Sequence, residues 1–264
     1  MKSTKRRSEI LKIIDQNGNV TVDQLLSVYP VSEETIRRDL RILADSGYVK
    51  RIYGGAVKLD KKSKYLPYEE RLSSHYPEKK AIGRSAVTML ENGDSIFIDG
   101  RTTCLVFADQ IPADMNLKIV TNSTILANNL MNKNGNLQIF LLGGQLSSEG
   151  LLTGPNLYEE LKRYRLDKAF FSCIGLDAEG CYFAKSDAQQ LTNVLQKISS
   201  ELILMADSSK INRQAFLSGL AIEQLTYIIT DDQASSDFKQ AVQQTNCELI
   251  TAENYHSDFP IFAT

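Results

Sequence analysis

The segment IDGRTT, residues 98–103, combines residue types that bind phosphate groups. Gly100 would let the backbone approach an anion, and Thr102 and Thr103 would offer hydroxyls at the start of a helix, where exposed amides carry a partial positive charge. The role of Arg101 in such a loop is open from the residues alone. We therefore predict a phosphate-binding loop here, with the position of the arginine undecided.

A second group of residues suited to an anion lies in the N-terminal part of the chain. Residues 1–62 hold 13 Lys and Arg against 8 Asp and Glu, a net charge of +5, whereas the remainder holds 17 against 24, a net charge of −7. These two values add up to the overall charge of −2. A small basic segment joined to a large acidic one indicates that only the first meets a polyanion such as nucleic acid.

Arginines lie along one face of a predicted helix in this basic segment. Ile36, Leu40 and Leu43 form its apolar stripe, so Arg38 and Arg41 point roughly the opposite way. Arginine on such a face can pair with guanine or hold a phosphate, and one sequence does not decide between these contacts. A solvated charged face on a small protein-binding module is the simpler alternative.

Nine residues form the expected DNA-binding set. They are Ser32, Thr35, Arg37, Arg38, Arg41, Lys50, Arg51, Tyr53 and Gly54. We expect Thr35 and Arg38 to lie near bases and Arg37 to hold a phosphate, while the hairpin residues meet the DNA backbone.

Three short helices are needed to position these residues. The first ends at Asn17-Gly18, a C-cap signal. Thr21 caps the second, which ends near Pro30, and Ser32 begins the third. Gly47 closes the third helix, as glycine often does.

A hairpin follows the third helix. The turn is predicted at Gly54-Gly55, between two short segments of alternating character. Three helices with such a hairpin form a winged helix-turn-helix domain, which we expect over residues 1–59. Residues 60–78 are polar and contain two prolines, so they are predicted to be a linker.

From residue 79 to residue 264, strand-like runs alternate with helix-like ones. The runs are DSIFID, NLKIVTN, LQIFLLGG, KAFFSCIG, ELILMADSSK, LTYIITDD and CELIT. Continuous apolar runs of this kind predict an α/β domain with a largely parallel sheet that is buried on both faces. Several runs end in small or polar residues, and such ends converge on one crevice in an open α/β sheet.

Composition excludes several classes of protein. No segment approaches the roughly 18–20 apolar residues of a membrane span, and the N-terminus lacks the apolar centre of a signal peptide, so a cytoplasmic protein without membrane contact is expected. Four widely spaced cysteines and two histidines support neither a disulfide framework nor a zinc site. We expect buried free thiols, no metal and no cofactor.

The string VSEETIRRDLRILADSGYVKRIYGGAV, residues 31–57, closely resembles the N-terminal signature of the DeoR family of bacterial transcriptional regulators. KKAIGRSAV, IDGRTT, VTNS, LLGG, FFSCIGLD, ADSSK and IITD fall where the sensor domain of that family has similar strings. The resemblance implies a sensor domain similar in fold to ribose-5-phosphate isomerase and coenzyme A transferases. It also implies a phosphorylated sugar as effector.

A sugar phosphate needs an anion cradle and a polar wall that contacts its hydroxyls. The expected effector-binding residues are Asp99, Gly100, Arg101, Thr102, Thr103, Asn122, Gly143, Gly144, Lys185, Asp187 and Lys210. Simpler interpretations stand beside several of them. Asn122 could only cap a helix, Gly143-Gly144 could be a tight turn, and Lys210 could be solvated.

Two positions depart from the pattern of the family. Arg101 stands where the loop commonly has a small residue, and Leu191-Thr192 stand where a Lys-Arg pair is usual. A cation lost from one wall and gained in the cradle would be a compensating exchange. Within the family, SHYPEKKAIGR, the TTC after Arg101 and FFSCIGLD look most like the L-fucose operon regulators, which implies a ketose 1-phosphate such as a deoxy-ketose phosphate as effector.

Together with the resemblance, these observations predict a regulator of a carbohydrate-utilisation operon, and not an enzyme. A repressor is the first expectation, but the residues do not decide between repressor and activator, because the sign depends on where the operator lies relative to the promoter. Symmetric operators would require a homodimer or homotetramer. A sugar-phosphate isomerase or transferase with a DNA-binding extension is the alternative, with Asp99, Asp177 and Asp187 as candidate bases by position. A structural adaptor without a ligand is a third possibility, which the many polar strand ends argue against.

Overall fold

The computed structural model describes residues 3–45, 49–58, 68–133 and 135–253. The chain divides into two compact units, Met1–Leu66 and Pro67–Thr264. We describe each unit by itself. None of the helices in the described ranges is long and apolar enough to cross a membrane.

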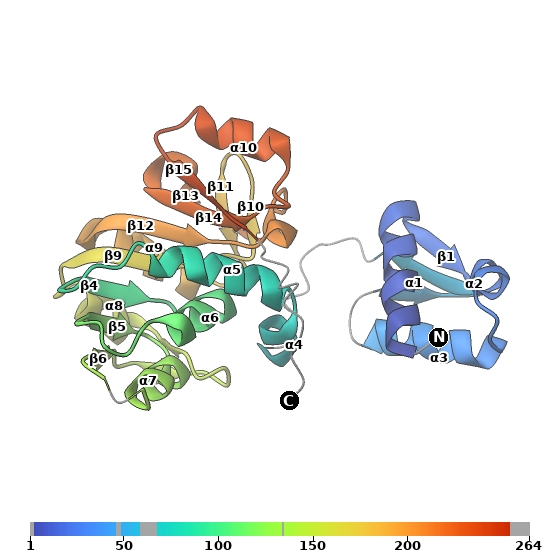
Figure 1. Ribbon diagram of the computed structural model, residues 1–264, viewed down its shortest axis with the longest axis horizontal. Coiled ribbons are helices and arrows are strands. Elements are labelled where there is room, and N and C mark those ends of the chain that lie inside the picture. Colours follow the sequence, from blue (N-terminus) through green and yellow to red (C-terminus); the bar gives the residue numbers. More distant parts are fainter. Residues whose placement is uncertain (1–2, 46–48, 59–67, 134, 254–264) are drawn as a thin grey trace, which may run out of the picture. The chain divides into compact units, whose positions relative to one another are not determined.

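The N-terminal unit is a winged helix-turn-helix (Figure 1). Its helices are α1 (Ser3–Asn17), α2 (Val22–Val28) and α3 (Glu33–Asp45), and its strands are β1 (Asn19–Thr21), β2 (Val49–Ile52) and β3 (Gly55–Lys58). Thr21 caps α2 in a reciprocal capping box with Gln24. The predicted stripe of α3 is buried against Ile10 and Ile14 of α1 and against Leu25 of α2. Helix periodicity thus predicted this unit correctly.

The wing differs from the prediction in two respects. Its two-residue turn is Tyr53-Gly54, because Ile52 pairs with Gly55 in the ladder. Gly54 has a φ of +76°, which favours glycine, whereas Gly55 packs against β1, where a Cβ would lie 2.2 Å from the Val20 carbonyl oxygen. The short strand β1 was not predicted. The predicted helix end at Gly47 lies outside the described residues.

A seven-stranded sheet forms the centre of the second unit. Its strands, in spatial order, are β15 (Glu248–Ala252), β14 (Tyr227–Asp231), β12 (Ser199–Met205), β9 (Leu166–Phe171), β4 (Ser95–Ile98), β5 (Lys118–Thr121) and β6 (Gln138–Leu141). Every neighbouring pair is parallel. All seven predicted strand runs therefore lie in one parallel sheet, as expected.

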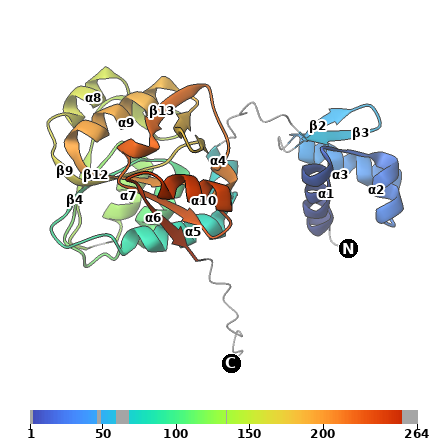
Figure 2. The same ribbon diagram turned by 90° about the horizontal axis from the view of Figure 1, so that it is seen from above.

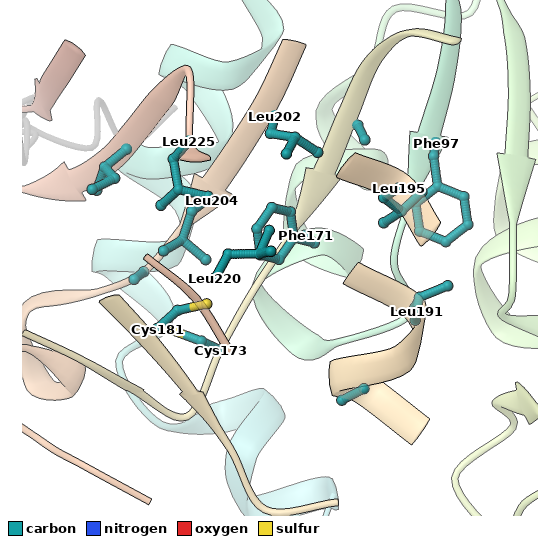
Figure 3. Close-up of a cluster of buried hydrophobic side chains, with 14 of the residues drawn as sticks. Phe97, Phe171, Cys173, Cys181, Leu191, Leu195, Leu202, Leu204, Leu220 and Leu225 are labelled. Carbon is teal, nitrogen blue, oxygen red and sulfur yellow. The ribbon is translucent and has the colours of Figure 1, made fainter. Parts of the chain in front are cut away.

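Helices cover both faces of this sheet, which explains why its strands read as continuous apolar runs (Figures 1 and 2). On β4, Ile96 and Ile98 pack with α5 (Tyr76–Val87), α6 (Thr102–Gln110) and α7 (Thr124–Met131). Phe97 faces the opposite cluster, with α8 (Pro155–Leu161), α9 (Ser186–Ile198) and α10 (Ser236–Gln243) (Figure 3). All four cysteines are free and buried, as predicted.

Part of the predicted linker is helical. Helix α4 (Tyr68–Ser73) and the start of α5 fall within residues 60–78, and residues 59–67 lie outside the description. One of the two prolines that suggested a linker, Pro77, stands in the first turn of α5, where its missing N–H costs no hydrogen bond. Polar composition was misleading here because α4 is held by its tertiary contacts.

The connections of the sheet define where a ligand can lie. The chain runs outward from β4 through β5 to β6, and then returns to β9 on the other side of β4. The strand order therefore reverses between β4 and β9, and open α/β sheets bind ligands outside the carboxyl ends of the strands at such a point. The predicted phosphate loop follows β4 directly, at this reversal.

Smaller elements surround the same end of the sheet and were not predicted. A three-stranded antiparallel sheet contains β10 (Gly175–Leu176), β11 (Gly180–Phe183) and β13 (Leu217–Ala221). A two-stranded one contains β7 (Gln145–Leu146) and β8 (Leu152–Thr153). The residues of these short strands do not form the continuous apolar runs that marked the strands of the large sheet.

Candidate anion-binding crevice and nucleic-acid interface

Lys210 joins three strand ends at the reversal of the strand order. It lies in a short 3₁₀ turn after β12, and its Nζ donates to Ser172 Oγ at 2.9 Å and to Thr103 Oγ1 at 3.2 Å. Ser172 follows β9, and Thr103 lies in the first turn of α6, after β4. The same ammonium lies 3.4 Å from Asp207 Oδ2. Lys210 is thus a positioned cation and not a solvated surface lysine.

The charge of Lys210 has a buried counter-ion. Asp207 is 1% exposed, and burial alone would raise its pKa. Lys210, a hydrogen bond from Ser209, and the positive charges of His75 and Lys79 outweigh this effect and lower the pKa of Asp207. The lowered pKa favours the ionised form of Asp207, and burial strengthens its interaction with the ammonium of Lys210.

Arg101 forms a second ion pair at the end of β4. Its Nε lies 2.9 Å from Asp99 Oδ2, and its guanidinium lies over the ring of Phe183 from β11, 5.6 Å from the centroid. The side chain is 13% exposed, so it points into the protein and not out to solvent. Burial raises the pKa of Asp99, against the opposing effects of Arg101 and a hydrogen bond from Asn122.

Gly100 is required for close packing. Its amide donates to Asn122 Oδ1 at 3.0 Å, so this N–H is already bonded. A Cβ on Gly100 would lie 2.3 Å from Leu151 Cδ2 and 2.4 Å from Ser123 Cβ. Ser123 is the N-cap residue of α7, because its hydroxyl accepts a hydrogen bond from the amide of Leu126. Asn122 instead holds the backbone of Gly100. The first-turn amides of α6 would be the backbone part of an anion cradle at this position.

Gly143 and Gly144 are two further predicted effector residues, and each has a contact of its own. The amide of Gly143 donates to Glu160 Oε2 at 2.8 Å, and Gly144, with a φ of +149°, packs against the Thr153 carbonyl. Both lie in the segment between β6 and β7, two strands away from β4.

The remaining two begin α9. Asp187 accepts a hydrogen bond from the Tyr158 hydroxyl at 3.1 Å, and burial together with this carboxylate raises the pKa of Tyr158 to about 12. Lys185 is the N-cap residue of α9, two residues after the ring that lies beside Arg101. Asp187 is thus held from the α8 side, while Lys185 comes two residues after the end of β11.

Residues that the sequence did not single out complete the centre. They are Lys79, Ser172, Phe183 and Asp207. Ser172 and Asp207 were visible as members of FFSCIGLD and ADSSK, but a serine and an aspartate at strand ends carry no specific signal. Nothing in the helical pattern around Lys79 marks it as buried, because lysine normally reaches solvent.

Lys79 links the crevice to α4. It is 3% exposed and its Nζ donates to the carbonyls of Arg71 and Ser74, the latter at 2.7 Å, at the C-terminal end of α4. Burial and the charge of Lys210 lower the pKa of Lys79 to about 8. A change in charge at Lys210 would therefore alter the electrostatic environment of Lys79, which holds the end of α4.

The predicted DNA-binding residues lie at the start of α3 and on the wing. Ser32 Oγ accepts from the amide of Thr35 at 3.3 Å, which confirms Ser32 as the residue that begins the helix. Arg38 and Arg41 are exposed on the face opposite the buried stripe. Arg37 is exposed and pairs with Glu33 one turn earlier, with its Nε 2.7 Å from Glu33 Oε1. An exposed pair of this kind is worth at most about 1 kcal/mol, so a phosphate could replace Glu33.

The wing carries the remaining predicted DNA-binding residues. Arg51 Nη1 donates to the Arg37 carbonyl at 3.4 Å, which ties β2 to α3. Tyr53 and Gly54 form the tip of the hairpin, and Tyr53 is fully exposed. Lys50 lies on β2, and its side chain is outside the described set. The buried pair of Arg6 and Asp39, 2.6 Å apart, fixes α1 against α3 behind this face.

Comparisons with known proteins agree with both units. The DeoR-like helix-turn-helix domain matches residues 6–62, and the DeoR C terminal sensor domain matches residues 74–232. The glycerol-3-phosphate regulon repressor of Escherichia coli is 32% identical over 94% of this chain and 99% of its own length. The L-fucose operon activator of the same organism is 31% identical over 86% of this chain and 95% of its own.

Among solved structures, ribose 5-phosphate isomerase A from Methanocaldococcus jannaschii matches 50% of this chain and 53% of its own, with 14% identity and a TM-score of 0.37. The sequence relatives are named as regulators, which favours a regulator over the enzyme that the sequence left open. Both domain models fall on the units that carry the arginine face and the crevice. The chain belongs to the DeoR family of transcriptional regulators.

Proposed function

We propose that this protein is a repressor of a carbohydrate-utilisation operon that binds operator DNA through α3 and the wing and a phosphorylated sugar in the crevice around Lys210 and Arg101. A ketose 1-phosphate, such as a deoxy-ketose phosphate, is the first candidate effector. In this proposal the protein acts in the cytoplasm, where operator DNA and sugar phosphates meet. The glycerol-3-phosphate regulon repressor is the relative that supports repression, whereas the L-fucose operon activator carries the opposite sign.

The bridge that Lys210 makes between the ends of β9 and β4 is the observation that carries the proposal. It places a cation at the reversal of the strand order, beside the first turn of a helix. Ser172 and Thr103 add hydroxyls to this cation. A cation with hydroxyls and helix amides is the donor set that a phosphate dianion requires.

The two carboxylates of the crevice explain how binding would change the protein. Asp99 pairs with Arg101, and Asp207 pairs with Lys210. A phosphate dianion would compete with both carboxylates for these cations, so the bound and free states differ in their ion pairs. A ligand can shift a conformational equilibrium only through such differences in interaction.

Helix α4 is placed to transmit this change, because it is the first described helix after the N-terminal unit and two contacts tie it to the crevice. Lys79 holds its C-terminal end from the side of Lys210 and Asp207. Arg71 pairs with Glu149 at 2.6 Å, in the loop whose Leu151 packs over Gly100. Rearrangement of either ion pair in the crevice would therefore reach α4.

A thermal-shift series tests the proposal. Ligands that bind only the folded state raise its melting temperature, by an amount that grows with concentration over Kd. We expect phosphorylated ketoses to raise the transition of the sensor unit, and the same sugars without phosphate to leave it unchanged. A series in which no sugar phosphate acts, or in which the unphosphorylated sugar acts equally, would overturn the proposed effector class.

A further inference from the structure

Strand β6 ends the large sheet and leaves half of its backbone groups turned outward (Figure 1). The amide of Gln138 donates to the Leu117 carbonyl at 2.9 Å, and that of Leu142 to the Thr121 carbonyl at 3.0 Å. In a parallel ladder the residues that face the neighbour alternate, so residues 138, 140 and 142 turn toward β5. Ile139 and Leu141 consequently present their amides and carbonyls to the open edge.

The same edge is apolar. Phe140 is 40% exposed, Leu141 44%, Leu146 60%, and Met131, at the end of the adjoining α7, 68%. Residues 135–148 contain no Asp, Glu, Lys or Arg, and no proline. Charges and prolines are the usual means by which edge strands avoid pairing with another chain, so β6 lacks these defences. An exposed apolar group of this extent marks an interaction site.

The outward groups of β6 are complementary to themselves. With a two-fold axis at Phe140, an antiparallel partner strand would set Ile139 opposite Leu141 of the second copy, and Leu141 opposite its Ile139. Each of these residues turns its amide and carbonyl outward, so both pairs can exchange two hydrogen bonds. Phe140 would then face Phe140 of the second copy on the side of the sheet where it already contacts the Tyr164 ring, 6.3 Å between centroids.

We propose that β6 is the interface between two copies of this chain, which pair antiparallel through Ile139 and Leu141 and continue the sheet across the dimer. The lack of charge favours a second copy of this chain as the partner. Two uncharged apolar edges can pair without electrostatic repulsion, whereas this edge has no charged side chain with which a charged partner could pair. An isologous contact of this kind closes as a dimer. The role of the dimer in operator binding rests on the proposed function, whereas the pairing does not.

Two substitutions at one residue test the pairing. Leu141→Pro removes an amide that faces outward, and proline is tolerated on edge strands at just such positions, so the monomer keeps its fold. Leu141→Lys places a charge at the edge, opposite Ile139 of the second copy. Phe216→Lys is the matched control, since Phe216 is 88% exposed in the same unit and lies between η1 (Ser208–Lys210) and β13.

Sedimentation velocity over a concentration series, without DNA or effector, gives the dissociation constant of the dimer, and circular dichroism verifies folding. We expect the wild-type protein to dimerise, the Phe216→Lys variant to dimerise equally, and both Leu141 variants to dissociate with a constant at least 100-fold higher. A monomeric wild-type protein overturns the proposal, as do folded Leu141 variants that dimerise normally. Loss of dimer in Phe216→Lys alone would move the interface to the Phe216 loop. Because neither DNA nor sugar phosphate is present, failure here is separate from failure of the proposed function.

Discussion

Replacing Lys210 by methionine should destabilise the sensor unit through the carboxylate it leaves behind. Lys210→Met keeps most of the side-chain volume but removes the ammonium that lies 3.4 Å from Asp207 Oδ2. Asp207 stays 1% exposed, with Ser209 as its neutral partner. The buried carboxylate would then be ionised without its main counter-ion.

The size of the effect follows from this burial. Removal of one partner from a buried ion pair costs about 3–5 kcal/mol. The low end, about 3 kcal/mol, applies because the positive charge of Lys79 still acts on Asp207. For a unit of this length, about 2–4 °C of melting temperature correspond to each kcal/mol, so the transition should fall by about 6–12 °C at pH 7.

The loss should depend on pH with a defined sign. In the wild-type protein the folded pKa of Asp207 is lowered, so its contribution to stability is present above the unfolded pKa of about 3.9 and is lost as the pH falls through the folded value. In Lys210→Met, burial dominates and raises the folded pKa. The penalty is then present at neutral pH and is relieved as the pH falls through this raised value. The difference between the two proteins should therefore shrink from pH 7 toward pH 4.

Calorimetric melts of the full chain at several pH values between 4 and 7 measure this difference. The matched variant is Lys210→Met combined with Asp207→Asn, which removes the orphaned charge and should recover most of the lost stability. A Lys210→Met protein as stable as the wild type at pH 7 would refute the argument. A loss that is independent of pH, or that Asp207→Asn does not relieve, would refute it equally.

Three further predictions concern the crevice and the arginine face. Arg101→Ser should weaken binding of a sugar phosphate at least 10-fold by isothermal titration, with Arg101→Lys between the two; unchanged affinity and phosphate dependence would exclude Arg101 from the cradle. Arg38→Ala should cost about 1–3 kcal/mol of operator affinity and relax base selectivity, whereas Arg37→Ala should weaken all DNA sequences alike and reduce the salt slope by about 1; equal selectivity in both variants would contradict these roles. Gly100→Ala should lower sensor stability by about 1–3 kcal/mol in thermal melts, because its Cβ would lie 2.3 Å from Leu151 Cδ2, and a wild-type melting temperature would disprove this packing.

The parallel sheet could be predicted because its inner strands are buried on both faces. Ile96, Phe97 and Ile98 all lie in the interior, two toward one cluster and one toward the other, so the run is apolar without interruption. The stripe of α3 was equally clear, since Ile36 and Leu40 recur at helical spacing and are both fully buried. A continuous apolar run and a helical apolar stripe can both be recognised from the sequence alone.

The partners within the crevice could not be predicted, because they join residues far apart in the chain. Arg101 lies beside a ring from β11, 82 positions later, and Lys210 reaches Thr103 across 107 positions. No local pattern encodes such contacts. The one-residue error at the wing has a different cause, since Gly54-Gly55 offers two equivalent turn positions and only the packing of β1 on Gly55 selects between them.

Operator affinity with and without a bound sugar phosphate tests the central claim most directly. Fluorescence anisotropy of labelled operator DNA gives this affinity for the full chain, with a sugar phosphate that raises the melting temperature as the ligand. We predict that a saturating ligand changes the operator dissociation constant at least 10-fold, and that the change is lost with the unphosphorylated sugar and in Lys210→Met combined with Asp207→Asn. An operator affinity that stays the same when the crevice is occupied would contradict the account.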